Sequence, residues 1–509
     1  MSALASSLSG SAALLALAGL VTYVFAGAVY RLYFHPLAKF PGPKIAALTT
    51  WYEGWYDYLW LQGKFTFHLA DLHKKYGPIV RIGPNEVHIK DPEFFSQIYT
   101  MSSAKIDKYE YYYSMLGNPE ATFPTIAHET HKSRRAALAP FFSTAAVLRF
   151  QPVVQRVADR LCSRMRTALA ADEPIPLFFA FRGLTVDIVS EYLFGASPDI
   201  LERPDWGRSF YGAWRGLWEL SPLIRQIPGI LAVFRWTPRW LLKATNPKAL
   251  EVLDMETQTD AWTARLLATP EAEIKKRPQR TVLWEVAHSN ALPAEERTFK
   301  RLAVDGNNIL AAGFETTGNM LSHMMYGVLS QPAVHARLCK ELENAIPDPE
   351  SMPNSQVLEK LPYLNAVVKE TLRQGVGAFG RLSRVNRSSA VRYGDWLIPS
   401  GCAYGMSPLY VLWDETLFPD PGKFDPERWL GADAKRLEHY LVSFGRGPRL
   451  CVGMNLANAE LYVVGAAVVR RFPTLRLWET GPEDVKAIYD YFGGMWRFEE
   501  GSDGLQVKG

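Results

Sequence analysis

Cysteine and net charge are both scarce in this sequence. Its 509 residues include four cysteines and carry a formal net charge of +4. The cysteines form no C-x-x-C pair, which argues against a zinc site or a thioredoxin-like motif, and so few do not make a secreted disulfide framework. The low net charge gives no indication of a nucleic acid partner. A reducing compartment fits best, where one of Cys162, Cys339, Cys402 and Cys451 can act as a free thiolate.

Internal repeats, low-complexity tracts and Gly/Ser-rich linkers are also missing. Length alone suggests two or three domains, but nothing in the sequence marks a boundary between them. Hydrophobic residues make up 48% of the chain and aromatic residues 13%, enough to bury a large core. We therefore expect residues 46–509 to form one large catalytic domain.

A long uncharged hydrophobic run, SAALLALAGLVTYVFAGAVY, occupies residues 11–30. Twenty helical residues span about 30 Å, the thickness of the hydrocarbon core of a bilayer. Arg31 and Lys39 follow the run, whereas residues 1–10 carry no charged side chain. Because positive residues collect on the cytosolic side, we expect a lumenal N-terminus at 1–10, a transmembrane anchor at 11–30 and a cytosolic catalytic domain. A cleaved signal peptide ending near residues 26–28 is the alternative, although no basic segment precedes the run.

Residues 31–45 contain Pro36, Pro41 and Pro43, which favours a stiff, proline-rich linker between the anchor and the domain. Beyond it, most of the chain has the apolar spacing of helices, and strand signals are few. The expected fold class is therefore mainly α with small β-sheets, of the α+β type. The clearest helices are expected at residues 147–170, 249–267 and 296–329, and the strands at 79–82, 87–89, 381–393 and 497–507.

Residues 222–242 are apolar, aromatic and basic, and two prolines and a glycine interrupt them. They are either a buried connecting loop or a surface that dips into the lipid headgroups, with Arg225, Arg235 and Arg239 at the interface.

The strongest chemical signal is the run FGRGPRLCVG at residues 444–453. Gly447 and Gly453 permit tight turns around Cys451, and the charge of Arg449 favours the thiolate. A helix is expected at residues 454–471, and the partial positive charge at its start lowers the pKa of a thiol. A structural cysteine in a Gly-rich turn is the alternative.

This run is similar to the haem-binding loop of the cytochrome P450 family, F-x-x-G-x-R-x-C-x-G, at every fixed position, including Phe444 and Gly453. The resemblance covers nearly the whole chain and is greatest to fungal, microsomal-type, trichodiene oxygenase-like enzymes of secondary metabolism. It implies the P450 fold, haem b as the cofactor and Cys451 as the axial ligand of the haem iron. Arg449 would then also reach a haem propionate.

A second motif is the ETLR sequence in a helix expected at residues 362–375. Glu370 and Arg373 stand three residues apart on one face and can pair, and such a pair is usually solvated and weak. Residues 424–429, FDPERW, resemble the family's second arginine motif. The resemblance implies that Glu370, Arg373 and Arg428 form a buried structural triad behind the haem.

A third motif, AGFETT at residues 312–317, resembles the family's oxygen-activation segment. The resemblance implies that Thr316 supplies a hydroxyl to oxygen activation and that Glu315 helps to deliver protons. Gly313 would bring the helix backbone close to a ligand and loosen the helix. Phe314 is larger than the family pattern leads us to expect and would narrow the distal pocket. An ordinary helix interior is the alternative.

Two further sites resemble propionate ligands of the family. The W-x-x-x-R pattern falls on His131 and Arg135, with histidine in place of tryptophan, and Arg384 resembles a second arginine ligand. Surface-exposed basic residues are the alternative for residues 131–135.

The resemblance implies a single-pass monooxygenase of the endoplasmic reticulum membrane, which inserts oxygen from O2 into an apolar small molecule. By family position, residues 111–125, 376–382 and 492–496 and Phe314 would contact the substrate, and their apolar and aromatic content favours a terpenoid or polyketide. The chain lacks a Gly-rich nucleotide loop, so electrons are expected from NADPH through a separate NADPH-cytochrome P450 reductase. A haem-thiolate isomerase or dehydratase and a non-enzymatic haem protein are the alternatives, and neither needs a reductase. The expected docking face for the reductase comprises Lys132, Arg134, Lys435 and Arg446.

Overall fold

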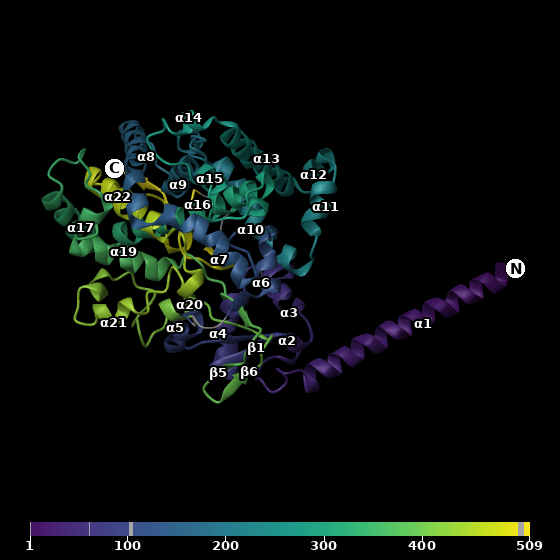
Figure 1. Ribbon diagram of the computed structural model, residues 1–509. Coiled ribbons are helices and arrows are strands. Elements are labelled where there is room, and N and C mark those ends of the chain that lie inside the picture. Colours follow the sequence, from purple (N-terminus) through teal and green to yellow (C-terminus); the bar gives the residue numbers. More distant parts are fainter. Residues whose placement is uncertain (1, 61, 101–104, 497–502) are drawn as a thin grey trace.

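Helices make up most of the molecule, and the main sheet lies at one side of it, near the base of the N-terminal helix (Figure 1). The computed structural model describes residues 2–60, 62–100, 105–496 and 503–509. Mainly helical structure with small sheets agrees with the fold class expected from the sequence. The longer helices are α1 (Ser2–Val29), α4 (Phe65–Tyr76), α5 (Pro92–Thr100), α7 (His128–Leu138), α8 (Thr144–Ala170), α9 (Leu177–Phe194), α10 (Arg208–Gln226), α13 (Pro247–Ala268), α16 (Phe299–Leu329), α17 (Pro332–Ala345), α19 (Pro362–Gly375) and α22 (Met454–Arg471).

The largest sheet has five strands in the order β1-β2-β7-β4-β3. The strands expected at 79–82 and 87–89 are confirmed as β1 and β2, which pair antiparallel, and the register shifts between Arg81 and Gly83. Smaller two-stranded sheets join β5 to β6, β9 to β10, and β8 to β11. Of the C-terminal strand expected at 497–507, residues 497–502 lie outside the described residues. The strands are β1 (Ile79–Gly83), β2 (Glu86–Ile89), β3 (Ile106–Lys108), β4 (Arg384–Asn386), β5 (Val391–Tyr393), β6 (Trp396–Ile398), β7 (Ala403–Gly405), β8 (Arg476–Leu477), β9 (Tyr489–Tyr491), β10 (Gly493–Met495) and β11 (Val507–Lys508).

Helices α9 and α16 form the centre of the core. Nearly every side chain of α9 is buried. A Cβ on Gly313 of α16 would lie 2.8 Å from Cγ2 of Val189, and a Cβ on Gly318 would lie 2.8 Å from Cγ of Arg182. The two helices approach this closely because glycine leaves room for the α9 side chains. Gly313 therefore allows close packing of α16 against α9. The expected loosening of the helix at Gly313 is wrong, because α16 continues through it as an α-helix.

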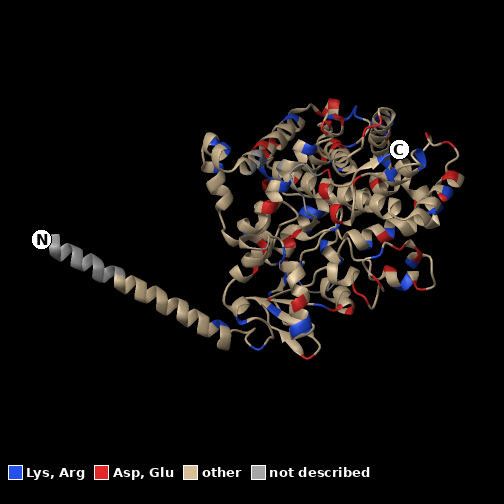
Figure 2. Ribbon diagram, turned by 180° about the vertical axis from the view of Figure 1, so that it is seen from behind, with Lys and Arg blue, Asp and Glu red and all other residues tan. Residues whose placement is uncertain are grey.

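Helix α1 projects from the body (Figure 1) and carries no charged side chain along its described surface until Arg31 (Figure 2). Residues Leu14–Phe34 form a span of 21 residues that is long and apolar enough to cross a membrane, and its most apolar window is not buried against the protein. A five-residue π-helix, Tyr30–Phe34, ends the span. These features are consistent with a membrane anchor.

Arg81 on β1 ties the domain to the base of α1. Its Nη1 donates to the carbonyl of Arg31 at 2.9 Å, and its Nη2 donates to the carbonyl of Pro84 at 2.7 Å. Its backbone N–H donates to the carbonyl of Pro41 at 2.6 Å, and Arg31 donates to the carbonyl of Leu48. Because Arg81 is buried, its own bonds are partly shielded from water, and together these bonds hold the linker against the sheet.

Residues 227–241 are largely exposed and mostly form short helices, so the alternative of a buried loop is wrong for them, whereas residues 222–226 end α10 and are mostly buried. Helix α10 ends at Gln226, and two short helices follow, α11 (Ile230–Trp236) and α12 (Arg239–Thr245). Trp236 is 87% exposed and Trp240 is 73% exposed. Arg225, expected at a lipid interface, is instead buried in an ion pair with Glu53.

Candidate active site

Cys451 lies in a tight loop directly before α22. Its backbone N–H donates to the carbonyl of Phe444 at 2.9 Å, which closes the loop. Gly445 and Gly447 have φ values of +74° and +70°, the left-handed region that favours glycine. Gly453 was expected to make a similar turn, but its φ is −82°. A Cβ on Gly453 would meet no protein atom within 4 Å, so this glycine leaves open space in the loop.

The Cys451 side chain lies among many protein atoms but keeps accessible surface on its open side. Burial raises the pKa of the thiol above its usual value, and this effect outweighs the backbone N–H groups of Gly453 and Met454 and the charge of Arg135, which all lower it. We expected the helix terminus and Arg449 to lower the pKa of this thiol. For the protein without a bound cofactor that expectation is wrong, because the pKa is raised. A cation bound at the sulfur would make the thiolate the stable form.

Five basic side chains meet beside the cysteine loop. They are Lys108 on β3, His131 and Arg135 on α7, Arg384 on β4 and Arg449. Burial and the charges of the other four lower the pKa of His131 to about 2. Burial and the charges of three arginines also lower the pKa of Lys108 well below its usual value. In the described part of the chain, none of the five forms an ion pair with a carboxylate. Asp107 acts on Arg449 only through space and pairs with Arg387 instead, so the cluster has no carboxylate in contact.

Among the described residues, the hydrogen bonds of the cluster go to neutral groups. Lys108 Nζ donates to the carbonyl of Phe123 and lies over the ring of Phe123 at 3.8 Å and that of Tyr113 at 4.0 Å. Arg449 donates to the carbonyls of Thr125 at 2.7 Å and Ile126 at 2.9 Å. These acceptors orient the basic groups and leave the positive charge of the arginines without a carboxylate partner among the described residues.

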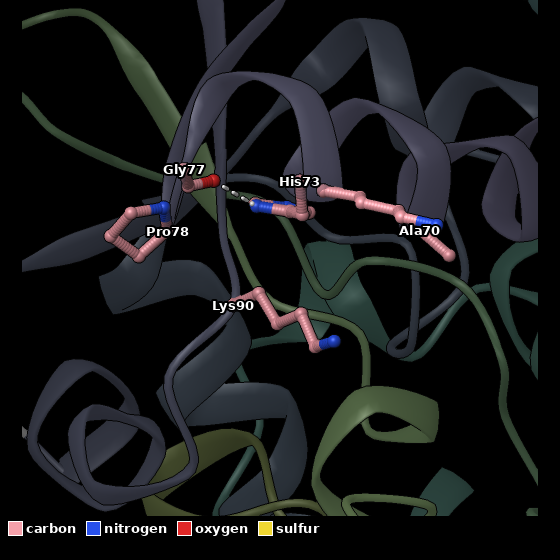
Figure 3. Close-up of a pocket in the computed structure, with 6 residues that line it drawn as sticks. Ala70, His73, Gly77, Pro78 and Lys90 are labelled. Atoms are coloured by element: carbon pink, nitrogen blue, oxygen red, sulfur yellow. Dashed lines mark hydrogen bonds between the residues drawn. The ribbon is translucent and has the colours of Figure 1, made fainter.

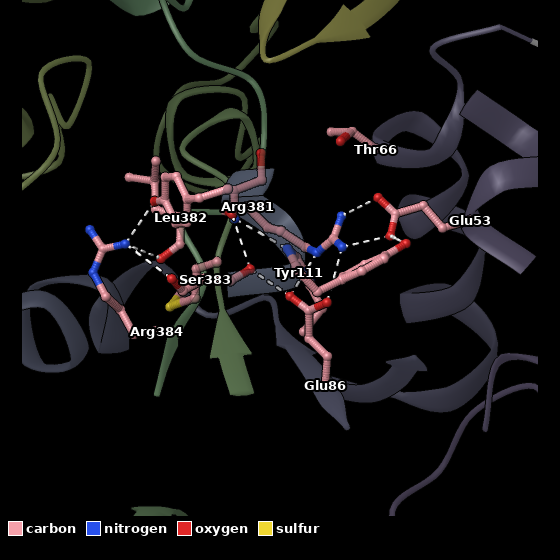
Figure 4. Close-up of polar contacts among 12 residues, drawn as sticks. Glu53, Thr66, Glu86, Tyr111, Arg381, Leu382, Ser383 and Arg384 are labelled. Atoms are coloured by element: carbon pink, nitrogen blue, oxygen red, sulfur yellow. Dashed lines mark hydrogen bonds and ion pairs between the residues drawn. The ribbon is translucent and has the colours of Figure 1, made fainter. Parts of the chain in front are cut away.

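Arg381, before β4, and Arg384, at the start of β4, point in opposite directions (Figure 4). Arg384 donates to the Tyr113 hydroxyl at 2.8 Å, on the side of the basic cluster. Arg381 pairs instead with Glu53 at 2.7 Å and Glu86 at 2.8 Å, and all three side chains are buried. Only Arg384 is therefore available to an anion at the cluster.

The motif at residues 312–317 presents different faces to different neighbours. Ala312 is exposed and Thr316 is half-buried, and the Thr316 hydroxyl donates to the carbonyl of Ala312 at 2.8 Å. Phe314 is fully buried, and its ring packs against Phe210 and Trp214 of α10, with centroids 5.7 and 5.2 Å away. This ring fills space between α16 and α10, and its effect on the size of the distal pocket stays a prediction.

Glu315 points toward α9, where Arg182 holds its carboxylate with two hydrogen bonds. Arg182 Nη2 donates to Oε1 at 2.9 Å, and Arg182 Nε donates to Oε2 at 3.1 Å. The side chain of Arg182 is 1% exposed and that of Glu315 is 9% exposed. Thr185 Oγ1 adds a hydrogen bond to the carbonyl of Phe314 at 3.0 Å. The acidic residue of the motif is thus held in a buried ion pair beside Thr316.

The three residues expected to form a structural triad lie together and are not solvated. Glu370 and Arg373 are fully buried, with Arg373 Nη2 2.8 Å from Glu370 Oε1, and Arg428 Nε lies 3.5 Å from the same oxygen. Trp429 Nε1 also donates to Glu370 at 2.9 Å. Arg373 donates further to the carbonyl of Leu412 at 3.1 Å, so the pair ties α19 to the chain that follows it.

Of the basic residues expected on a docking face, Lys132 and Lys435 are exposed and Arg446 is half-buried. Arg134 does not belong there, because its guanidinium is 11% exposed and pairs with Glu296 at 2.7 Å. A surface cavity elsewhere contains none of the expected site residues. It adjoins His73, which hydrogen-bonds to the carbonyl of Gly77 at 2.8 Å (Figure 3), and is lined by Ala70, His73, Lys74, Gly77, Pro78 and Lys90.

A family model described as Cytochrome P450 matches residues 41–487. The chain belongs to the cytochrome P450 family. Its sequence is 36% identical to cytochrome P450 monooxygenase sdnE of Sordaria araneosa, over 92% of this chain and 93% of that protein. It is 37% identical to cytochrome P450 monooxygenase tpcC of Cochliobolus heterostrophus (97% and 96%), and 35% identical to tryptophan 6-hydroxylase fscE of Fusarium equiseti (99% of both). The relatives are fungal monooxygenases, and this P450 is a monooxygenase of the same kind.

The site suits the haem-thiolate centre of the family. A haem carries an iron that would supply the positive charge missing at the Cys451 sulfur, and two propionates that would neutralise the basic cluster. Phe444 and Gly453 belong to the loop that would hold the haem beside Cys451. Sequence reasoning missed Lys108 and Arg182. A single arginine within the apolar run LFFAFRGLTVDIVS is a signal for the second of these, because a buried charge needs a partner.

Proposed function

We propose that this P450 is anchored in the endoplasmic reticulum membrane and oxidises an apolar small molecule with electrons from NADPH-cytochrome P450 reductase. The observation that carries the proposal is the pairing of Cys451, in its closed loop, with a basic cluster that has no carboxylate partner among the described residues. This arrangement matches a cofactor that has one thiolate-binding iron and two carboxylates.

In this proposal haem b, when bound, supplies the reductive activation of dioxygen. Cys451 holds the iron, and Lys108, His131, Arg135, Arg384 and Arg449 orient the propionates. Thr316 offers a hydroxyl on the accessible face of α16, and its present hydrogen bond to Ala312 leaves the hydroxyl oxygen free to accept another. Protons reach this hydroxyl from Glu315, whose carboxylate Arg182 keeps in place.

A terpenoid or polyketide remains the proposed substrate class, because apolar and aromatic side chains recur in the segments expected to contact substrate. Tyr113, Phe123 and Phe492 form edge-to-face pairs there. An indole is the second candidate, since two relatives are a tryptophan 6-hydroxylase and an N-acetyltryptophan 6-hydroxylase. Titration of the purified protein with tryptophan, N-acetyltryptophan and sesquiterpenes, followed by the shift of the haem absorbance, distinguishes the two.

Membrane contact is proposed at two places, the span Leu14–Phe34 and the exposed tryptophans of α11 and α12. In Figure 1, α11 and α12 lie on the side of the body toward which α1 projects. Arg235 and Arg239 pair with Glu256 and Asp254 of α13, so the apolar rings carry this second contact. For the reductase, we propose a docking face of Lys132, Lys435 and Arg446, without Arg134.

Spectroscopy of the reduced enzyme with carbon monoxide tests the iron ligand. The wild type should give the red-shifted Soret band of a thiolate-ligated haem, and Cys451→Ala should lose it while Cys402→Ala keeps it. Loss of the band in Cys402→Ala but not in Cys451→Ala would refute the assignment. Product that forms only with NADPH and reductase separates a monooxygenase from a haem-thiolate isomerase, which needs no electrons.

A further inference from the structure

The irregular loop at residues 117–127 touches both sides of the site. Toward the basic cluster, its carbonyls of Phe123, Thr125 and Ile126 accept hydrogen bonds from Lys108 and Arg449. The loop therefore sets the positions of two cationic groups that would meet the haem carboxylates.

The same loop faces the segments expected to contact substrate. The ring of Phe123 is 37% exposed and lies edge-to-face with Phe492, which follows β9, at 5.4 Å, and with Tyr113 at 6.0 Å. Since the carbonyl and the ring of Phe123 belong to one residue, a shift of the loop moves the substrate side and the cofactor side together.

One buried carboxylate on α16 holds this loop. Asp305 Oδ1 accepts from the backbone N–H of Thr122 at 2.6 Å, and Oδ2 accepts from the Thr122 hydroxyl at 2.9 Å. Arg301 pairs with Asp305 at 2.7 Å and donates to the Thr122 hydroxyl at 2.8 Å. Asp305 is 1% exposed and Arg301 is 4% exposed. Charge-assisted bonds shielded from water are strong and directional.

A second contact holds the loop through Arg301, which also pairs with another carboxylate. Glu296, just before α16, pairs with Arg301 at 2.8 Å and with Arg134 of α7 at 2.7 Å. Arg134 in turn donates to the Thr125 hydroxyl at 2.8 Å. The loop is thus held at Thr122 and Thr125, on either side of Phe123.

We propose that Asp305 is a positioning residue that couples the substrate side of the site to the haem carboxylates by holding the loop at Thr122. This inference rests on the proposed haem-binding function. Asp305 touches neither substrate nor cofactor in this scheme and acts through Phe123 and through the carbonyls that Lys108 and Arg449 bind.

Asp305→Asn in the full-length holoenzyme tests the proposal. Asparagine keeps an acceptor for Thr122 but removes the charge that Arg301 needs. Glu120→Gln is the matched control, because Glu120 and Lys300 pair at 2.9 Å between the same loop and the same helix, but both side chains are exposed. The two readouts are the rate of haem transfer to apomyoglobin and the ratio of the dissociation constants for imidazole and 1-phenylimidazole, which differ in size.

For Asp305→Asn we expect haem loss about tenfold faster and a ratio of the two dissociation constants changed about fivefold or more. Glu120→Gln should behave like the wild type. Factors of this size correspond to the loss of one hydrogen bond. A merely destabilised protein would weaken both azoles alike and leave the ratio unchanged. If Asp305→Asn does not fold, Thr122→Val, which keeps the backbone bond, is judged by the same two readouts. A change in only one readout, or in neither, overturns the proposal. Failure of the wild type to give the thiolate-haem band would instead overturn the proposed function itself.

Discussion

Replacement of Glu315 by glutamine separates proton delivery from packing. The amide has nearly the same shape and can still accept from Arg182, but it cannot carry a proton. A positioned proton donor is worth roughly 10²–10⁴-fold in rate, and water can replace part of it. We therefore expect product per NADPH consumed to fall at least about tenfold, with a matching rise in peroxide. Thr316→Ala should behave similarly, whereas Thr317→Ala, at the neighbouring buried threonine, should keep its coupling.

The structure adds a stability component to this prediction. Arg182 and Glu315 are both almost fully buried, and removal of one partner from such a pair typically costs about 3–5 kcal/mol. Arg182→Met should therefore lower both the melting temperature and the coupling, while Arg182→Lys, which keeps the charge but not the two-point geometry, should recover part of each. NADPH consumption, peroxide and product are measured together, and the carbon monoxide spectrum confirms that haem is retained. Unchanged product per NADPH in both Glu315→Gln and Thr316→Ala would refute the reasoning.

Three further predictions concern stability and membrane binding. Burial raises the pKa of Asp57 to about 8. Because the folded protein then holds this proton more tightly than the unfolded chain, stability should fall as pH rises from about 4 to about 8. Thermal unfolding of Asp57→Asn should depend less on pH, and an unchanged pH dependence would show that this carboxyl is not the cause. Gly313→Ala should cost about 1–3 kcal/mol by overpacking, measured by denaturant unfolding, and Val189→Ala should restore part of it; no rescue would contradict the packing shown by the 2.8 Å approach. Without residues 1–34, the protein should still bind liposomes, and Trp236→Ser with Trp240→Ser should weaken that binding; a truncated protein that stays in solution with both tryptophans present would count against the second contact.

Elements with local signals could be predicted from the sequence almost to the residue. The helix expected at 362–375 starts at a proline and ends at a glycine, and α19 has those bounds. The helix expected after the cysteine loop is α22. Glu370 and Arg373 also lie together, because a spacing of three residues on a helix brings its own geometry. Arg428 joins them as the family resemblance implies.

The orientation of single side chains depended on distant partners that no local pattern encodes. Glu315 turns toward Arg182, which is 133 residues away, and Arg225 is buried because Glu53, 172 residues away, pairs with it. The packing of Phe314 on Phe210 and Trp214 could not be predicted either, because the motif has no information on where α10 passes. Lys108 was overlooked because it stands alone in a short strand, and its role depends on three arginines from other elements.

The hydrogen bonds of Arg81 to the carbonyls of Arg31 and Pro41 would make a rigid joint between α1, the proposed anchor, and the catalytic domain. A helix whose apolar length exceeds the thickness of the bilayer adapts by tilting, and a rigid joint passes that tilt to the domain. In a thinner membrane the body would therefore rotate, raising or lowering α11 and α12 relative to the lipid surface. Bilayer thickness would in this way set how deeply α11 and α12 sit in the lipid surface, with no change inside the fold.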